Sequence, residues 1–164
     1  MKSIKGRVFV LGDNVDTDQI LPGFAMAEPF DQLGKFAMAG APDLDFVNQV
    51  QPGDIIVAGR NFGCGSSREQ APIALKMAGV SLIVAKGFAR IFRRNSINIG
   101  LPVYAADIAS LLKTGDVLEV DLEAGTLVLN GTTVTAPPLS ETVLKTLEYG
   151  GLINRVRAEL GITN

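Results

Sequence analysis

The sequence predicts an α/β fold with a partly parallel sheet, and three patterns carry that prediction. Buried-type apolar runs alternate with helical stretches between Asp54 and Ala105. Strand and helix alternating at such short spacing are typical of parallel strands joined by crossover helices. Lys5–Leu11 alternates polar and apolar residues, as a strand does. The last third, after Lys113, contains a hairpin pattern that would close the sheet in the antiparallel sense.

The segments before Asp54 are less regular than the centre of the chain. After the strand at Lys5–Leu11, the Asp-rich stretch Gly12–Gly23 predicts a loop. Helical spacing predicts a helix over Phe30–Ala39, ended by Gly40. A short helix is expected over Asp43–Val50.

The centre of the chain predicts three buried strands with a helix after each of the first two. The expected strands are Asp54–Ala58, Ser81–Lys86 and Leu101–Ala105, and the expected helices are Arg68–Ala78 and Phe88–Asn98. Gly79 directly follows the first helix and Gly100 lies two residues after the second, where glycine commonly ends a helix.

The C-terminal third predicts a hairpin and a helical tail. The expected elements are a short helix at Asp107–Lys113, strands at Val117–Asp121, Thr126–Leu129 and Thr132–Thr135, and helices at Ser140–Glu148 and Leu152–Leu160. Asn130-Gly131 is a favoured pair for a tight hairpin turn. The sequence contains no internal repeat or low-complexity linker, so we expect residues 1–164 to form one domain.

Composition narrows the possible functions. Hydrophobic residues make up 47% and charged residues 20%, with a net charge of −2, which is an ordinary globular balance. The sequence has no basic stripe, so nucleic-acid binding is not expected. No apolar run approaches the roughly 20 residues of a membrane span. Histidine is absent and Cys64 is the sole cysteine, so a disulfide, zinc site or iron–sulfur site cannot be completed within the chain. These features predict a cytoplasmic protein.

The densest chemical signal is the glycine-rich segment Gly59–Gln70, which follows a buried strand and opens a helix. Ser66 with Glu69, and Ser67 with Gln70, each match a capping box. A helix N-terminus favours a bound anion, and Arg68 is suited to gripping a carboxylate with two parallel hydrogen bonds. The plain alternative is a strand–turn–helix junction that binds nothing.

Other motifs are excluded by their spacing. The glycine-rich segment lacks the Lys-Ser/Thr of a P-loop and the glycine spacing of a dinucleotide fingerprint. Without histidine, no Ser–His pair is available. Asp13–Asp18 resembles the start of a calcium loop but lacks its later Gly and Glu. The three arginines of Phe88–Asn98 are interpreted as a solvated helix face.

Three segments together resemble a known family. They are Asp13–Ile20, Asn61–Glu69, and Phe88–Asn95 with Ile97–Pro102. The set resembles the small subunit of 3-isopropylmalate dehydratase, which is similar to the swivelling C-terminal domain of aconitase. The resemblance extends from about Lys5 to Leu160 and implies a swivelling β/β/α domain with a partly parallel central sheet flanked by helices.

The resemblance implies a hydro-lyase that is active only with a large subunit carrying a [4Fe–4S] cluster. It assigns a serine alkoxide base to Ser66, substrate-carboxylate binding to Ser67 and Arg68, and a cleft-facing position to Asp18. Gly63 and Gly65 support the turn. The implied reaction interconverts 2-isopropylmalate and 3-isopropylmalate by dehydration and rehydration, in leucine biosynthesis. Arg90 and Asn95 match family positions interpreted as structural.

The loop after Asp18 departs from the family pattern. Relatives that accept a third carboxylate tend to carry an arginine there, whereas no Arg or Lys occurs between Arg7 and Lys35. A buried carboxylate without a cation is costly, so a homoaconitase-type substrate is disfavoured. Phe24, Ala25 and Met26 instead suit an alkyl group.

Several alternatives stay open. An apolar pocket discriminates one methylene weakly, so 2,3-dimethylmalate or methylmalate are alternative substrates. Cys64, beside the turn, is interpreted as a packing residue. The alternative to an enzyme subunit is a non-catalytic anion-binding or regulatory module that keeps the same fold. We expect the chain to bind an alkylmalate and to join the large subunit in a heterodimer or heterotetramer. A homo-oligomer and a monomer stay open for the isolated chain.

Overall fold

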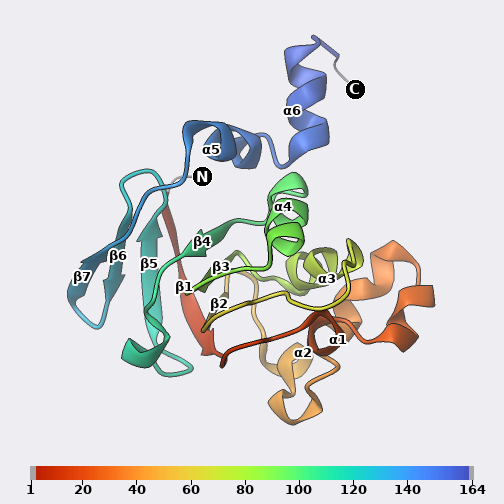
Figure 1. Ribbon diagram of the computed structural model, residues 1–164, viewed down its shortest axis with the longest axis horizontal. Coiled ribbons are helices and arrows are strands. Elements are labelled where there is room, and N and C mark those ends of the chain that lie inside the picture. Colours follow the sequence, from red (N-terminus) through yellow and green to blue (C-terminus); the bar gives the residue numbers. More distant parts are fainter. Residues whose placement is uncertain (1–2, 163–164) are drawn as a thin grey trace.

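A computed structural model describes residues 3–162 and contains a seven-stranded mixed sheet (Figure 1). The strands are β1 (Ser3–Val10), β2 (Ile55–Ala58), β3 (Leu82–Ala85), β4 (Val103–Ala105), β5 (Val117–Asp121), β6 (Thr126–Leu129) and β7 (Thr132–Thr135). Their order in the sheet is β4-β3-β2-β1-β5-β6-β7. β1 to β4 run parallel, and β5 pairs antiparallel with β1. The predicted α/β fold with a partly parallel sheet is confirmed.

The helices lie mainly over one face of the parallel strands (Figure 1). They are α1 (Thr17–Ile20), α2 (Phe46–Gln49), α3 (Gln70–Ala78), α4 (Arg90–Asn98), α5 (Glu141–Glu148) and α6 (Leu152–Glu159). Shorter 3₁₀ helices span Gly23–Ala27, Phe30–Phe36, Pro42–Leu44 and Ala109–Leu111. Within residues 3–162, no helix combines the length and the hydropathy that crossing a membrane requires.

The parallel strands β2 and β3 are buried along their whole length because side chains of the sheet alternate between two apolar cores. Phe9 and Ile56 belong to the core under α3 and α4. Val8 and Ile55 belong to the second core, which also contains Leu118 and its neighbours on β5 and β6. The antiparallel half therefore curls over the face that the helices leave uncovered, and β2 and β3 can be apolar throughout.

Helix α3 begins two residues later than predicted, and a proline explains the shift. A helix that began at Arg68 would place Pro72 where its nitrogen should donate to the carbonyl of Arg68. Beginning at Gln70 places Pro72 within the first turn, where a missing N–H leaves no unmade bond. The predicted strands, in contrast, are confirmed to within two residues.

Several other expectations for helices and loops were wrong in detail. The short helix expected at Asp107–Lys113 is a 3₁₀ helix over Ala109–Leu111, and α4 begins at Arg90 rather than Phe88. The expected loop Gly12–Gly23 contains α1, because Asp16 caps that helix and Gln19 completes a capping box. The expected helix over Phe30–Ala39 is a 3₁₀ helix that ends at Phe36. The expected helix over Asp43–Val50 is split at Asp45, whose φ is +49°.

Candidate active site

Three loops meet where β1, β2 and β3 end. The loop after β1 pairs with the loop after β2 through a bridge between Asp16 and Cys64. The loop after β2 pairs in turn with the loop after β3 through a bridge between Phe62 and Phe88. The carboxyl ends of parallel strands share one sheet edge, which is where open α/β sheets place their ligands.

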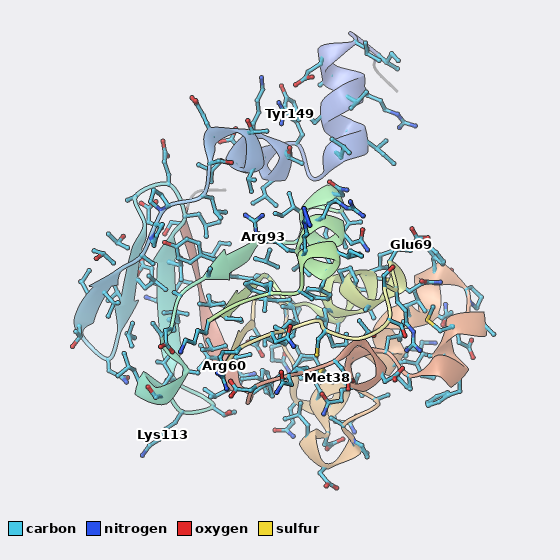
Figure 2. All side chains as sticks on the ribbon, viewed as in Figure 1. Met38, Arg60, Glu69, Arg93, Lys113 and Tyr149 are labelled. Atoms are coloured by element: carbon cyan, nitrogen blue, oxygen red, sulfur yellow. The ribbon has the colours of Figure 1, made fainter. Side chains whose placement is uncertain are left out.

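A pocket of about 240 Å³ lies between the turn after β2 and the beginning of α4. It is lined by Thr17, Gly63, Gly65, Ser66, Ser67, Arg68, Ala89, Arg90, Ile91, Phe92 and Asn95. Five residues that the sequence singled out therefore share this pocket, and both serine side chains are exposed. Figure 2 shows the neighbouring Glu69 beside the turn, between α4 and the segments that follow β1.

Backbone and hydroxyl hydrogen bonds hold the turn against the loop after β1. Thr17 donates twice, from its backbone nitrogen to the Cys64 carbonyl and from Oγ1 to the Ser66 carbonyl, both at 2.9 Å. Gly63 donates its backbone N–H to the carbonyl of Val15 at 2.7 Å. Because Thr17 is only 2% exposed, water competes little for these bonds.

Two glycines of the turn are required by its geometry. Gly63 has φ of +81°, and a Cβ at this position would overlap the ring of Phe92. Gly65 has φ of +95°, and its Cβ would approach Oγ1 of Thr17 to 3.3 Å. Only glycine adopts such angles without strain, so both residues keep the turn close to α4 and to the loop after β1.

The three carboxylates of Asp13–Asp18 point to three different partners. Asp13 accepts the backbone N–H of Arg60 at 2.7 Å, and this hydrogen bond holds the pKa of its carboxyl below the usual value. Asp16 caps α1, and Asp18 pairs with Arg68. Within residues 3–162 there is no group of three or more acidic, cysteine or histidine side chains that could bind a metal.

Arg68 is already partnered in this structure. Its Nη1 lies 2.6 Å from Oδ1 of Asp18 and donates to the Leu21 carbonyl at 2.8 Å. Arg68 lines the pocket, whereas Asp18 does not. Asp18 therefore compensates the charge of Arg68 from outside the pocket. The roles in substrate binding expected for Ser67, Arg68 and Asp18 stay predictions.

The two capping boxes predicted around the serines do not form. The N-cap of α3 is Glu69, in the helical conformation and without a side-chain hydrogen bond. Ser66 and Ser67 lie further upstream, as a consequence of the later helix start that Pro72 imposes. The helix whose N-terminus lines the pocket is α4, and its N-cap, Ala89, offers no side-chain acceptor.

The predicted alkyl-binding residues lie outside this pocket. Phe24 is 70% exposed, and its ring packs edge-to-face with that of Phe36, with 6.0 Å between the centroids. Ala25 is fully buried, and Met26 packs against the core. Neither Phe24, Ala25 nor Met26 lines the pocket, so their contact with substrate stays a prediction.

Arg90 and Asn95 line the pocket, although the sequence interpretation gave them a structural role. The signal that could have placed them is topological. α4 follows β3, the neighbour of β2, so its first turn must lie beside the turn that follows β2. Two backbone bonds make this junction, from Phe62 N to Gly87 O and from Ala89 N to Phe62 O.

Known proteins are similar in sequence over nearly the whole chain. The model of the aconitase C-terminal domain matches residues 31–106. A methanogen homoaconitase small subunit from Methanothermobacter thermautotrophicus is 51% identical, over 92% of this chain and 89% of the relative. A 3-isopropylmalate dehydratase small subunit from Archaeoglobus fulgidus is 50% identical, over 93% of each.

A solved structure is also similar to this chain over nearly its whole length. The crystal structure of 3-isopropylmalate dehydratase from Methanocaldococcus jannaschii matches with a TM-score of 0.90 at 42% identity, covering 96% of this chain and 95% of that one. The chain belongs to the family of 3-isopropylmalate dehydratase small subunits, which carry the aconitase C-terminal domain. The expected family and the expected class, a subunit of a hydro-lyase, are confirmed.

Proposed function

We propose that the chain is the small subunit of a hydro-lyase that interconverts 2-isopropylmalate and 3-isopropylmalate in leucine biosynthesis. The observation that carries the proposal is one pocket in which exposed Ser66 and Ser67 meet Arg68, in a chain without histidine. A relative half identical to this chain is named for the same reaction. The proposal places the protein in the cytoplasm, in keeping with its single cysteine.

In this proposal Ser66 is the general base, as an alkoxide that removes a proton from the carbon adjacent to the one that bears the departing hydroxyl. Free serine is far too weak an acid to ionise unaided, so the alkoxide needs a positive environment. The N-terminus of α4 supplies partial positive charge at the pocket wall. Arg68 lines the same pocket, with its charge compensated by Asp18. Thr17 holds the Ser66 backbone in place through its hydroxyl.

The [4Fe–4S] cluster belongs to the large subunit in this proposal. Cys64 is the sole cysteine of the chain and no histidine is present, so these residues do not fit a cluster. When bound in the partner, the cluster supplies Lewis-acid chemistry at the substrate hydroxyl and one carboxylate. The part of this chain is to bind the other end of the acid and to move the proton.

The choice of substrate within the proposal depends on the charge of the loop after Asp18. An isopropylmalate is favoured because residues 8–34 contain no Arg or Lys to meet a third carboxylate. A related alkylmalate, 2,3-dimethylmalate or methylmalate, is the nearest alternative. A homoaconitase-type tricarboxylate is the second alternative, and the relative named homoaconitase small subunit, at 51% identity, is the observation that favours it.

The test is reconstitution of the two-chain enzyme. The chain is co-expressed with a cluster-bearing large subunit, iron is restored anaerobically, and formation of the unsaturated acid is followed by absorbance. 3-Isopropylmalate, 2,3-dimethylmalate and homocitrate are compared, with Ser66→Ala as the matched variant. We expect 3-isopropylmalate to be turned over fastest and the activity to disappear in Ser66→Ala.

Two outcomes would contradict the proposal in different ways. Fast turnover of 2,3-dimethylmalate or homocitrate, with little from 3-isopropylmalate, would keep the hydro-lyase and change its substrate. A stable complex with an intact cluster that converts none of the acids would favour a non-catalytic module.

A further inference from the structure

We propose that Arg90 is a second carboxylate-binding residue of the pocket and determines which acids the site accepts. The inference rests on the proposed function, because it concerns the substrate of that same site. Arg90 lies at the beginning of α4 and lines the same pocket as Ser66 and Arg68.

The charge balance of the pocket singles out Arg90. Two arginines line the pocket, and Arg68 is compensated by Asp18 at 2.6 Å. Arg90 forms no ion pair or side-chain hydrogen bond with any residue between 3 and 162. It is therefore the pocket's uncompensated cation, and a dianionic substrate would meet a wall with one free positive charge.

Arg90 and its neighbours can bind a carboxylate through several hydrogen bonds. Guanidinium binds carboxylate through two parallel hydrogen bonds. Asn95, on the same helix and lining the same pocket, adds an amide that can donate to a second oxygen. Ile91 and Ala89 provide apolar surface beside these groups, which matches an acid with an alkyl branch.

Arg90 also changes the argument about tricarboxylates. The sequence interpretation disfavoured a third carboxylate because the loop after Asp18 carries no cation. The structure brings a cation to the pocket from α4 instead, about 70 residues along the chain. The identity of the residue at position 90 is thus a determinant of acid selection that is separate from the loop.

The same helix provides a matched control. Arg93 is exposed and lies one turn further along α4, but it does not line the pocket. Figure 2 shows Arg93 on the side of α4 opposite to the turn that carries Glu69. Arg90→Ala and Arg93→Ala therefore remove the same charge from the same helix, and only the first removes it from the pocket.

The experiment compares Arg90→Ala, Arg90→Lys and Arg93→Ala in the reconstituted two-chain enzyme, measuring kcat and KM separately for 3-isopropylmalate and homocitrate. Calorimetric binding of each acid and the affinity for the large subunit are measured on the same samples. We expect Arg90→Ala to raise KM about 10- to 100-fold with a smaller change in kcat, as for a lost hydrogen bond to a charged group. Arg90→Lys should recover part of that loss, and Arg93→Ala should resemble wild type.

The inference is overturned if Arg90→Ala and Arg93→Ala have the same KM, or if Arg90→Ala only weakens the large-subunit complex. If wild type binds an acid without converting it and Arg90→Ala loses that binding, the proposed reaction fails while the inference stands. If wild type neither binds nor converts any acid, both fail.

Discussion

The turn Gly59–Arg68 and the neighbouring segment 23–36 are held in place by different forces. The turn is tied by directional bonds, among them those from Thr17 to Cys64 and Ser66. In segment 23–36, no side chain forms a hydrogen bond or ion pair with another residue of the described range 3–162. That segment is held by packing, with Ala25 and Leu33 fully buried.

This difference indicates how one fold can keep its chemistry and vary its substrate. Hydrogen bonds fix atoms to within fractions of an ångström, as a base requires. Apolar packing is non-directional and tolerates exchange of side chains of similar volume. We therefore expect substitutions in the turn to reduce catalysis or folding, and substitutions in segment 23–36 to alter preference among acids.

The largest effect should come from Ser66→Ala. Because the expected base is removed, kcat of the reconstituted enzyme should fall by roughly 10²- to 10⁴-fold, with the melting temperature unchanged because Ser66 is exposed. Ser67→Ala is the control and should mainly raise KM. Equal losses of kcat in both variants would show that the turn as a whole, rather than one hydroxyl, is needed.

Gly63→Ala should be the most destabilising single change in the turn. The new methyl group meets the ring of Phe92 at a left-handed φ, so the free energy of unfolding should fall by about 2 to 5 kcal/mol in urea titration. Gly23→Ala is the control from the packed segment. No atom lies within 4 Å of the Cβ that alanine would add there, so the free energy of unfolding of this variant should be unchanged. Similar losses of unfolding free energy in both variants would show that the turn is no more constrained than segment 23–36.

Thr17→Val separates the hydrogen bond from the packing. Valine keeps the shape but leaves the carbonyl of Ser66 without its donor, so we expect about 1 to 3 kcal/mol less stability and a lower kcat at unchanged KM. Thr17→Ser retains the hydroxyl and should restore kcat. A Thr17→Ser variant as slow as Thr17→Val would mean that packing, not the bond, positions the turn.

The smallest effect should come from Phe24→Ala. Its ring is 70% exposed, so the free energy of unfolding should change by less than about 0.5 kcal/mol. If the ring contacts the alkyl end of the acid, the preference of kcat/KM for 3-isopropylmalate over 2,3-dimethylmalate should fall by about tenfold or less. An unchanged preference would assign alkyl recognition to other residues.

The parts of this molecule that follow from local pattern were predictable, and the parts that depend on neighbours were not. Apolar runs such as Ile55-Ile56-Val57 place the parallel strands correctly because both faces are buried. The order of residues Gly63–Arg68 was enough to predict a glycine-rich turn between a strand and a helix. Pro72 could have predicted the late start of α3.

Arg90 shows what local pattern leaves out. Three arginines on one helix are alike in sequence, and only the packing of α4 beside the turn makes Arg90 differ from Arg93. Likewise, nothing in the order of residues indicates that Asp18 meets Arg68, which lies 50 positions away along the chain. Such pairs become visible only when the ends of adjacent strands are brought together.

The position of β1 in the middle of the sheet has a consequence for synthesis of the protein. Its two neighbours are made long after it, since Val8 pairs with Ile55 on one side and Ser3 with Asp121 on the other. Until Val117–Asp121 has left the ribosome, the emerging strands of the parallel half leave one edge of β1 without a partner. Open strand edges attract other chains, so a pause in translation before Val117 should be the moment of greatest risk of aggregation.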